Sequence, residues 1–78
     1  MTRIRSFEKG SQNVRVHTSD SDCRYQVVSD AAGEVFLHLS TFGSDDRASD
    51  AKSSQSMQFD REQALSLIRV LRETFPGL

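Results

Sequence analysis

The chain has 78 residues, enough for one small domain over residues 1–78 with a modest core, and domains of this size are often stabilised by self-association. Its net charge of −1, from 10 basic and 11 acidic residues, argues against a strongly basic nucleic-acid binder but leaves a locally basic face open. The one cysteine excludes an intrachain disulfide, and there is no secretory signal pattern and no apolar run near the ~18 residues of a membrane span, so we expect a cytoplasmic protein without membrane contact.

Two stretches near the N-terminus alternate polar and apolar side chains, as strands do. Residues 2–8 alternate weakly around Ile4. Residues 13–18 alternate cleanly, with Val14 and Val16 on one face and an arginine and a histidine on the other. We therefore expect a strand in each stretch.

Residues 23–28 predict a further strand, whose facing stays open because two valines are adjacent in it. Either Arg24 or Tyr25 then joins the outer face of the sheet, depending on register. Residues 29–34 predict a hairpin connection in which Gly33 is free to adopt a positive φ.

The strand over residues 35–42 has the strongest pattern in the chain. One face carries Val35, Leu37 and Leu39, and the other carries Phe36, His38 and Ser40. A long loop rich in Ser and Asp follows over residues 43–54. Residues 55–59 then predict a short strand in which Met57 and Phe59 share a face.

A C-terminal helix is indicated by its start, its apolar pattern and its end. Asp60 occupies the N-cap position, and Gln63, three residues later, completes a capping box. Pro76 and Gly77 end the helix. The apolar side chains that recur at helical spacing are Ala64, Ile68, Leu71 and Phe75, widened to an arc of roughly 220° by Leu65, Leu67 and Val70.

So wide an apolar arc exceeds what one small sheet covers, and two explanations are open. The helix is either set deeply on a curved sheet or also packed on a second copy of the chain. We favour the second explanation, which places Leu67, Val70 and Leu71 in a dimer interface. The order of elements predicts an α+β fold, with a four- to five-stranded antiparallel sheet followed by one helix packed on one face.

If the valines and leucines face the helix, the opposite sheet face collects basic and aromatic side chains. These are Arg15, His17, Phe36 and His38, joined by Arg3 and Arg5 and by Arg24 or Tyr25. Most acidic residues fall in turns and loops instead, where Asp is favoured anyway. Such a face suits single-stranded nucleic acid, because bases stack on rings and cations follow phosphates. Long basic side chains also simply solvate an exposed sheet, and this explanation stays open.

The 43–54 loop offers a second basic surface. Gly43 and several serines permit tight turns with free N–H groups, and Arg47 and Lys52 add positive charge, a combination that can hold a phosphate. Arg47 can equally pair with a neighbouring aspartate, and the loop can be a plain hairpin tip. We favour a functional loop, because it joins the strongest strand to the strand that precedes the helix.

The sequence contains no catalytic or metal-binding motif. Two histidines and Cys23 on uncertain faces are too few for a metal site, and no motif orients a base for Cys23 as a nucleophile. There is no P-loop, no H-E-x-x-H and no Gly-rich βα turn. We therefore predict that the protein is not an enzyme and uses no metal and no cofactor.

The second half of the chain runs from the strand VFLHLSTF at residues 35–42 to KSSQSMQFDREQALSLIRVL at residues 52–71, a short strand and an acid-capped helix. This order resembles the single-stranded-DNA-binding domain of the transcriptional coactivator family named for positive cofactor 4, with its small bacterial relatives. The resemblance implies a curved four-stranded antiparallel sheet before one helix, a homodimer joined through the helices, and DNA held on sheet and loops. It also implies a backbone-contacting role for Lys52 and stacking roles for Phe36, His38 and Phe42.

Our first hypothesis is a non-enzymatic, homodimeric module that binds single-stranded nucleic acid. Its binding residues are Arg15, Arg24, Phe36, His38, Phe42, Arg47 and Lys52. The alternative is a protein-interaction or accessory module, related to phage or defence systems, that uses the 43–54 loop or a sheet edge. A third hypothesis is a nucleotide-binding protein that holds phosphate with loop N–H groups and Arg47.

Overall fold

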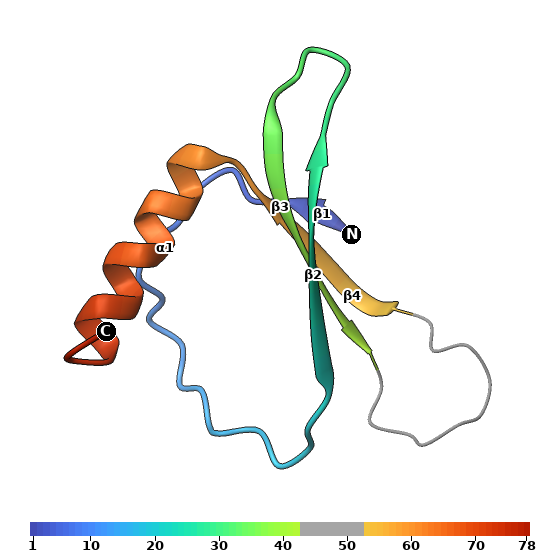
Figure 1. Ribbon diagram of the computed structural model, residues 1–78. Helices are drawn as coiled ribbons and strands as arrows, with labels where there is room; N and C mark the ends of the chain where they lie inside the picture. The colour runs from blue at the N-terminus through green and yellow to red at the C-terminus, as the bar shows by residue number, and fades with distance from the viewer. Residues whose placement is uncertain (43–52) are drawn as a thin grey trace.

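The computed structural model describes the backbone of residues 1–42 and 53–78, which form a mixed sheet followed by one helix (Figure 1). The elements are β1 (Thr2–Arg3), β2 (Asp22–Ser29), β3 (Val35–Phe42), β4 (Ser53–Phe59) and α1 (Arg61–Thr74). The sheet order is β1-β4-β3-β2. The α+β class is thus confirmed. The sheet is not antiparallel throughout, because the N-terminus fills the edge beside β4 as the short parallel strand β1.

The predicted strand over residues 13–18 is wrong. Residues 4–21 contain no strand or helix, and the predicted strand over residues 2–8 is reduced to the two residues of β1. Val14 and Val16 are 72% and 94% exposed, so these two side chains do not pack on an apolar surface. A period of two permits a strand, but a neighbouring strand and a packed face are needed to form one.

The hairpin between β2 and β3 forms as predicted. The backbone N–H groups of Ala32 and Glu34 both donate to Oδ1 of Asp30, at 3.0 and 2.9 Å. Gly33 donates its N–H to the Asp30 carbonyl at 3.0 Å and has a φ of 85°, the left-handed conformation that glycine tolerates best. The turn is therefore set by two local residues, an aspartate and a glycine.

The helix also begins and ends as predicted. The N–H of Gln63 donates to Oδ1 of the N-cap Asp60 at 2.8 Å. The side chain of Gln63 does not complete a capping box, because its Nε2 donates instead to the Arg5 carbonyl at 3.3 Å. This bond ties the first turn of α1 to the N-terminal segment. The helix ends at Thr74, just before Pro76.

The helix does not lie across a face of the sheet as expected. Figure 1 shows α1 standing to one side, and its main contacts with the sheet are with β4, the strand that precedes it. None of its side chains is buried. Asp60 is the only residue between β4 and α1, and so short a connection leaves the helix beyond the end of the strand.

The two sheet faces follow from the pairing of the strands. We call one the histidine face, which carries Arg3, Asp22, Arg24, Gln26, Val28, Phe36, His38, Ser40, Phe42, Ser56 and Gln58. We call the other the apolar face, which carries Tyr25, Val27, Val35, Leu37, Leu39, Met57 and Phe59. The pairing of Arg24 with Ser40 settles the open facing of β2, so Arg24 and not Tyr25 joins His38.

The core is small and lies partly on the unexpected face. Among the described side chains the buried hydrophobic ones are Phe59 and Phe36, which are 4% and 6% exposed, and none is fully buried. Phe7 packs its ring 6.4 Å from that of Phe59. Val35, next to Phe36 but on the apolar face, is 58% exposed. The prediction that Phe36 lies on an open face is therefore wrong, because the side chain of Arg3, from the edge strand β1, lies over its ring.

Candidate nucleic-acid interface

Two arginines of the histidine face lie over phenylalanine rings. The guanidinium carbon of Arg24, on β2, is 4.7 Å from the ring centre of Phe42, at the end of β3. The guanidinium carbon of Arg3, on β1, is 5.5 Å from the ring centre of Phe36. Both distances fall within the range of a cation–π interaction, which fixes each cation while leaving its N–H groups able to donate.

The two rings differ in what they offer a ligand. Phe36 is 6% exposed, so its ring has almost no surface left for stacking and its role is to fill the core. Phe42 is only half-buried and stands at the end of β3. Of the two predicted stacking rings, Phe42 is the accessible one.

His38 stands in the middle of the histidine face. Its Nδ1 lies 3.0 Å from Nε2 of Gln58 on β4. An amide NH₂ donates, so this contact fits an imidazole that accepts at Nδ1 and carries its proton on Nε2. Gln58 thereby holds the ring in place, and the opposite edge of the ring can interact with a ligand.

A hollow of about 370 Å³ opens beside His38. It is lined by Met1, Gln26, His38, Ser40, Phe42, Gln55 and Ser56. Amides and hydroxyls beside an imidazole and an aromatic ring provide donors, acceptors and stacking surface together. This combination matches the needs of an unpaired nucleobase, which stacks on a ring and bonds along its edge.

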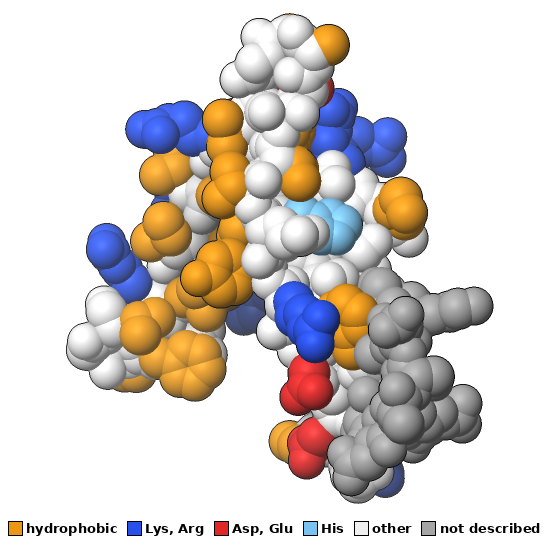
Figure 2. All heavy atoms as spheres, turned by 45° about the vertical axis from the view of Figure 1, so that its right-hand side comes forward, with side chains coloured by type: hydrophobic (Ala, Val, Ile, Leu, Met, Phe, Trp, Pro, Cys, Tyr) orange, Lys and Arg blue, Asp and Glu red, His pale blue; other side chains and the backbone are white. Residues whose placement is uncertain are grey.

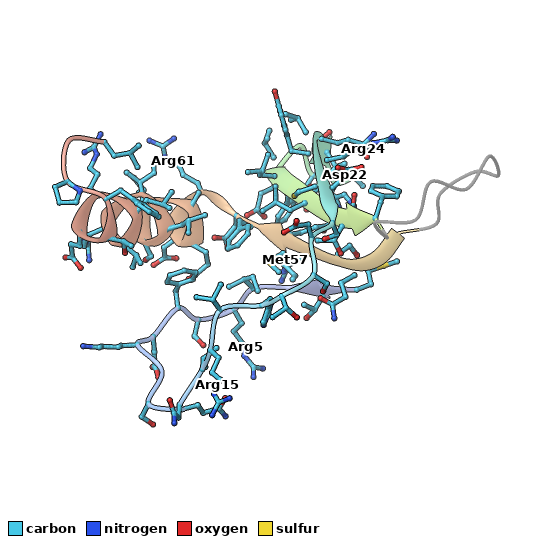
Figure 3. The ribbon with its side chains drawn as sticks, turned by 90° about the horizontal axis from the view of Figure 1, so that it is seen from below. Arg5, Arg15, Asp22, Arg24, Met57 and Arg61 are labelled. Atoms are coloured by element: carbon cyan, nitrogen blue, oxygen red, sulfur yellow. The ribbon has the colours of Figure 1, made fainter. Side chains whose placement is uncertain are left out.

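Arg15 and His17 do not join this face, so that prediction is wrong. Both lie exposed in the segment between β1 and β2, because the strand predicted there does not form. Figure 3 shows Arg15 on the N-terminal segment, on the opposite side of the sheet from Arg24. The predicted contacts Arg47 and Lys52 lie outside the described residues.

Gln26 and Gln58 were not among the predicted site residues. Gln58 could be expected there, since it alternates with Met57 and Phe59, whereas the placement of Gln26 beside His38 needed the β2–β3 register. Within the described part of the chain, no three His, Cys, Asp or Glu side chains come close enough together to hold a metal ion.

The apolar face and the helix enclose a groove on the other side of the sheet. Its lining includes Val35, Leu37, Phe59, Leu65 and Ile68, and hydrophobic side chains gather between α1 and the sheet (Figure 2). The predicted dimer contacts on α1 are partly accessible: Leu67 and Leu71 are half-buried, and Val70 is 40% exposed.

Comparisons with models of known families, with curated proteins and with solved structures find no match for the chain. The resemblance to the positive cofactor 4 family, and the sheet curvature that it implies, stay predictions. Within the described residues, α1 is too short and too polar to cross a membrane.

Proposed function

We propose that the chain is a non-enzymatic, homodimeric module that binds single-stranded nucleic acid on its histidine face, in the cytoplasm. One observation carries this proposal: two arginines lie over phenylalanine rings on the same sheet face as the hollow beside His38. Near-neutral net charge is compatible with it, because contacts are made by the local face and not by the whole chain.

Each group on the face has a distinct task in this proposal. A base packs beside Phe42 and His38 in the hollow, while the amide of Gln26 bonds to its edge. Arg24 and Arg3 contact the phosphates: Arg24 lies over Phe42, which lines the hollow, and Arg3 lies over Phe36 on the same sheet face. Because any base has a stacking face and only one hollow is used, little sequence preference is expected.

Residues 43–52, which lie outside the described residues, are also part of this proposal. They begin directly after Phe42 in the sequence, so Arg47 and Lys52 are proposed as additional phosphate contacts. They would add to the salt dependence of binding.

The test is a titration of fluorescein-labelled oligothymidine at low salt, followed by anisotropy. We expect micromolar binding that weakens with salt, with a slope of about −0.7 per phosphate contacted. Phe42→Ala should weaken binding by about 5- to 150-fold, the cost of about 1–3 kcal/mol for one lost stacking contact. Arg24→Ala should weaken binding and flatten the salt slope by one contact.

Arg69→Ala is the matched control, because Arg69 is exposed on α1, away from the histidine face. This variant should bind like the unmodified chain. Absence of micromolar binding, or binding without salt dependence, would reject the proposal.

A second candidate function is recruitment of a protein partner by the groove between α1 and the apolar face. It is favoured by the exposure of Val35, Leu65 and Ile68, which are 58%, 53% and 44% exposed around that groove. A partner of this kind should be captured after nuclease treatment and lost with Ile68→Lys. Capture that persists with Ile68→Lys would exclude the groove.

A further inference from the structure

The strand β2 forms a bare edge of the sheet. It pairs with β3 on one side, and Figures 1 and 3 show no described segment along its other side. The N–H of Asp30 donates to the carbonyl of Glu34 and so sets the phase of the β2–β3 ladder. By the alternation of an antiparallel pair, the backbone groups of Cys23, Tyr25, Val27 and Ser29 point outward from the sheet.

Apolar side chains accompany these outward backbone groups. Tyr25 and Val27 are 74% and 71% exposed on the apolar face, and Cys23 beside them is exposed as well. Soluble proteins usually protect a long edge strand with lysine, proline or a bulge. The eight residues of β2 contain no lysine, no proline and no bulge, and their two charged side chains, Asp22 and Arg24, lie on the histidine face, so this edge is suited to pairing with another strand.

We propose that β2 pairs antiparallel with β2 of a second copy, about a twofold axis through Tyr25. This inference rests on the homodimer of the proposed function and names its interface. It differs from the helix-mediated dimer expected from the sequence.

The choice of a second copy follows from the residues that meet in this register. Tyr25 faces Tyr25 of the other copy, and Cys23 faces Val27, so the apolar side chains pair with one another on one face. On the histidine face Arg24 lies opposite Gln26, which can accept its hydrogen bonds.

The neighbouring registers bring like charges together. If the twofold axis passes through Arg24, that residue faces Arg24 of the other copy. If the axis passes through Gln26, Asp22 of one copy faces Asp30 of the other. Like charges directly opposite destabilise a strand pair. Registers in which the axis passes between two residues, with Tyr25 opposite Gln26 for example, are excluded. They would pair the apolar face of one copy with the histidine face of the other.

A second copy also adds apolar contacts, of which the single chain has few. The described side chains include only two buried hydrophobic ones, Phe36 and Phe59, which is a sparse core for a domain of this size. Pairing at β2 brings Tyr25 and Val27 into side-by-side contact with apolar side chains of the second copy. Because the axis stands perpendicular to the sheet, the two histidine faces lie on the same side, with the two Arg24 residues as diagonal neighbours at about 7–8 Å.

Cross-linking tests the register directly. In a Cys23→Ser background, Tyr25→Cys places two thiols opposite each other, with Cα atoms at about 5.5 Å, within the range of a disulfide. We expect a covalent dimer on mild oxidation. The matched control, Gln26→Cys in the same background, is displaced from its counterpart and should remain mostly uncross-linked. Equal or greater cross-linking at Gln26 would overturn the register.

Oligomeric state tests the interface. The unmodified chain should be a dimer by light scattering, and Val27→Lys should be a monomer. Val14→Lys is the control, because Val14 is 72% exposed but lies outside the sheet, and this variant should stay dimeric. A monomeric unmodified chain, a dimeric Val27→Lys, or dissociation by Val70→Lys on α1 would overturn the proposal. The cross-linking experiment decides the question if Val27→Lys does not fold.

These measurements contain no nucleic acid, so they separate the two proposals. A dimer that fails to bind oligothymidine would reject the nucleic-acid function and leave the β2 interface in place. A monomer that binds oligothymidine would reject the β2 interface and the homodimer and leave nucleic-acid binding in place.

Discussion

The rest of the chain covers the two faces of this sheet to different extents. On the histidine face, Phe36 is buried beneath the side chain of Arg3, from the edge strand β1, and a hollow opens beside His38. On the apolar face, the helix reaches only the end near Phe59 and leaves Val27 and Val35 exposed. Hydrophobicity alone therefore does not tell which face of a small sheet is covered. The placement of the segments before and after the sheet decides it.

The largest expected effect separates two neighbouring residues on opposite faces. Phe36→Ala should lower the free energy of unfolding by about 3–5 kcal/mol, because it empties a buried site. Val35→Ala should lower it by less than about 1 kcal/mol, because Val35 is already exposed to water. Urea unfolding followed by circular dichroism measures both. A larger loss from Val35→Ala than from Phe36→Ala would reverse the assignment of the covered face.

A smaller effect is expected at the junction that orients the helix beside the apolar face. Asp60→Ala removes the acceptor for the Gln63 N–H and should cost about 1 kcal/mol of stability. Glu73→Ala, in the last turn of the same helix, should change stability by less than about 0.5 kcal/mol. Thermal unfolding of the two variants makes the comparison. Equal losses would mean that Asp60 does not act as a cap.

On the histidine face, a double-mutant cycle measures the contact between Arg24 and Phe42. The single variants Arg24→Gln and Phe42→Leu and the double variant should give a coupling of about 0.5–1 kcal/mol in unfolding free energy, as expected for an exposed cation–π pair. The same cycle between Arg24 and Phe75, which lies at the end of the helix, is the control and should give none. A coupling indistinguishable from that control would show that the ring does not hold the cation.

The smallest expected effect is on oligothymidine affinity, at Arg15, which the sequence places on the binding face and the structure does not. Arg15→Ala should change oligothymidine affinity by less than about twofold, because Arg15 lies on the N-terminal segment and not beside the hollow. Anisotropy titrations of Arg15→Ala and Arg24→Ala at the same salt concentration make the comparison. If Arg15→Ala were the more damaging change, the binding surface would include the N-terminal segment.

Features encoded by neighbouring residues could be predicted from the sequence. Strand β3, the turn at Asp30 and Gly33, and the helix between Asp60 and Pro76 depend on local alternation, capping and backbone freedom. The strand expected over residues 13–18 depended on a partner strand, which a local pattern cannot supply.

In the candidate site, too, some features could be predicted from local sequence and others could not. Residues within one strand, such as His38 and Phe42, share a face because side chains alternate, and this followed from the sequence. The contribution of Arg24 needed the β2–β3 register, and the burial of Phe36 needed the position of β1. Both depend on contacts between residues far apart in the chain.

The most direct measurement is side-chain NMR during an oligothymidine titration at low salt. The amide NH₂ groups of Gln26 and Gln58 report on the histidine face, and the methyl groups of Val35 and Ile68 report on the apolar groove. We predict that the two amide signals move with added oligothymidine while the methyl signals stay in place. Stationary amide signals, or movement of the methyl signals alone, would contradict the assignment of nucleic-acid binding to the histidine face.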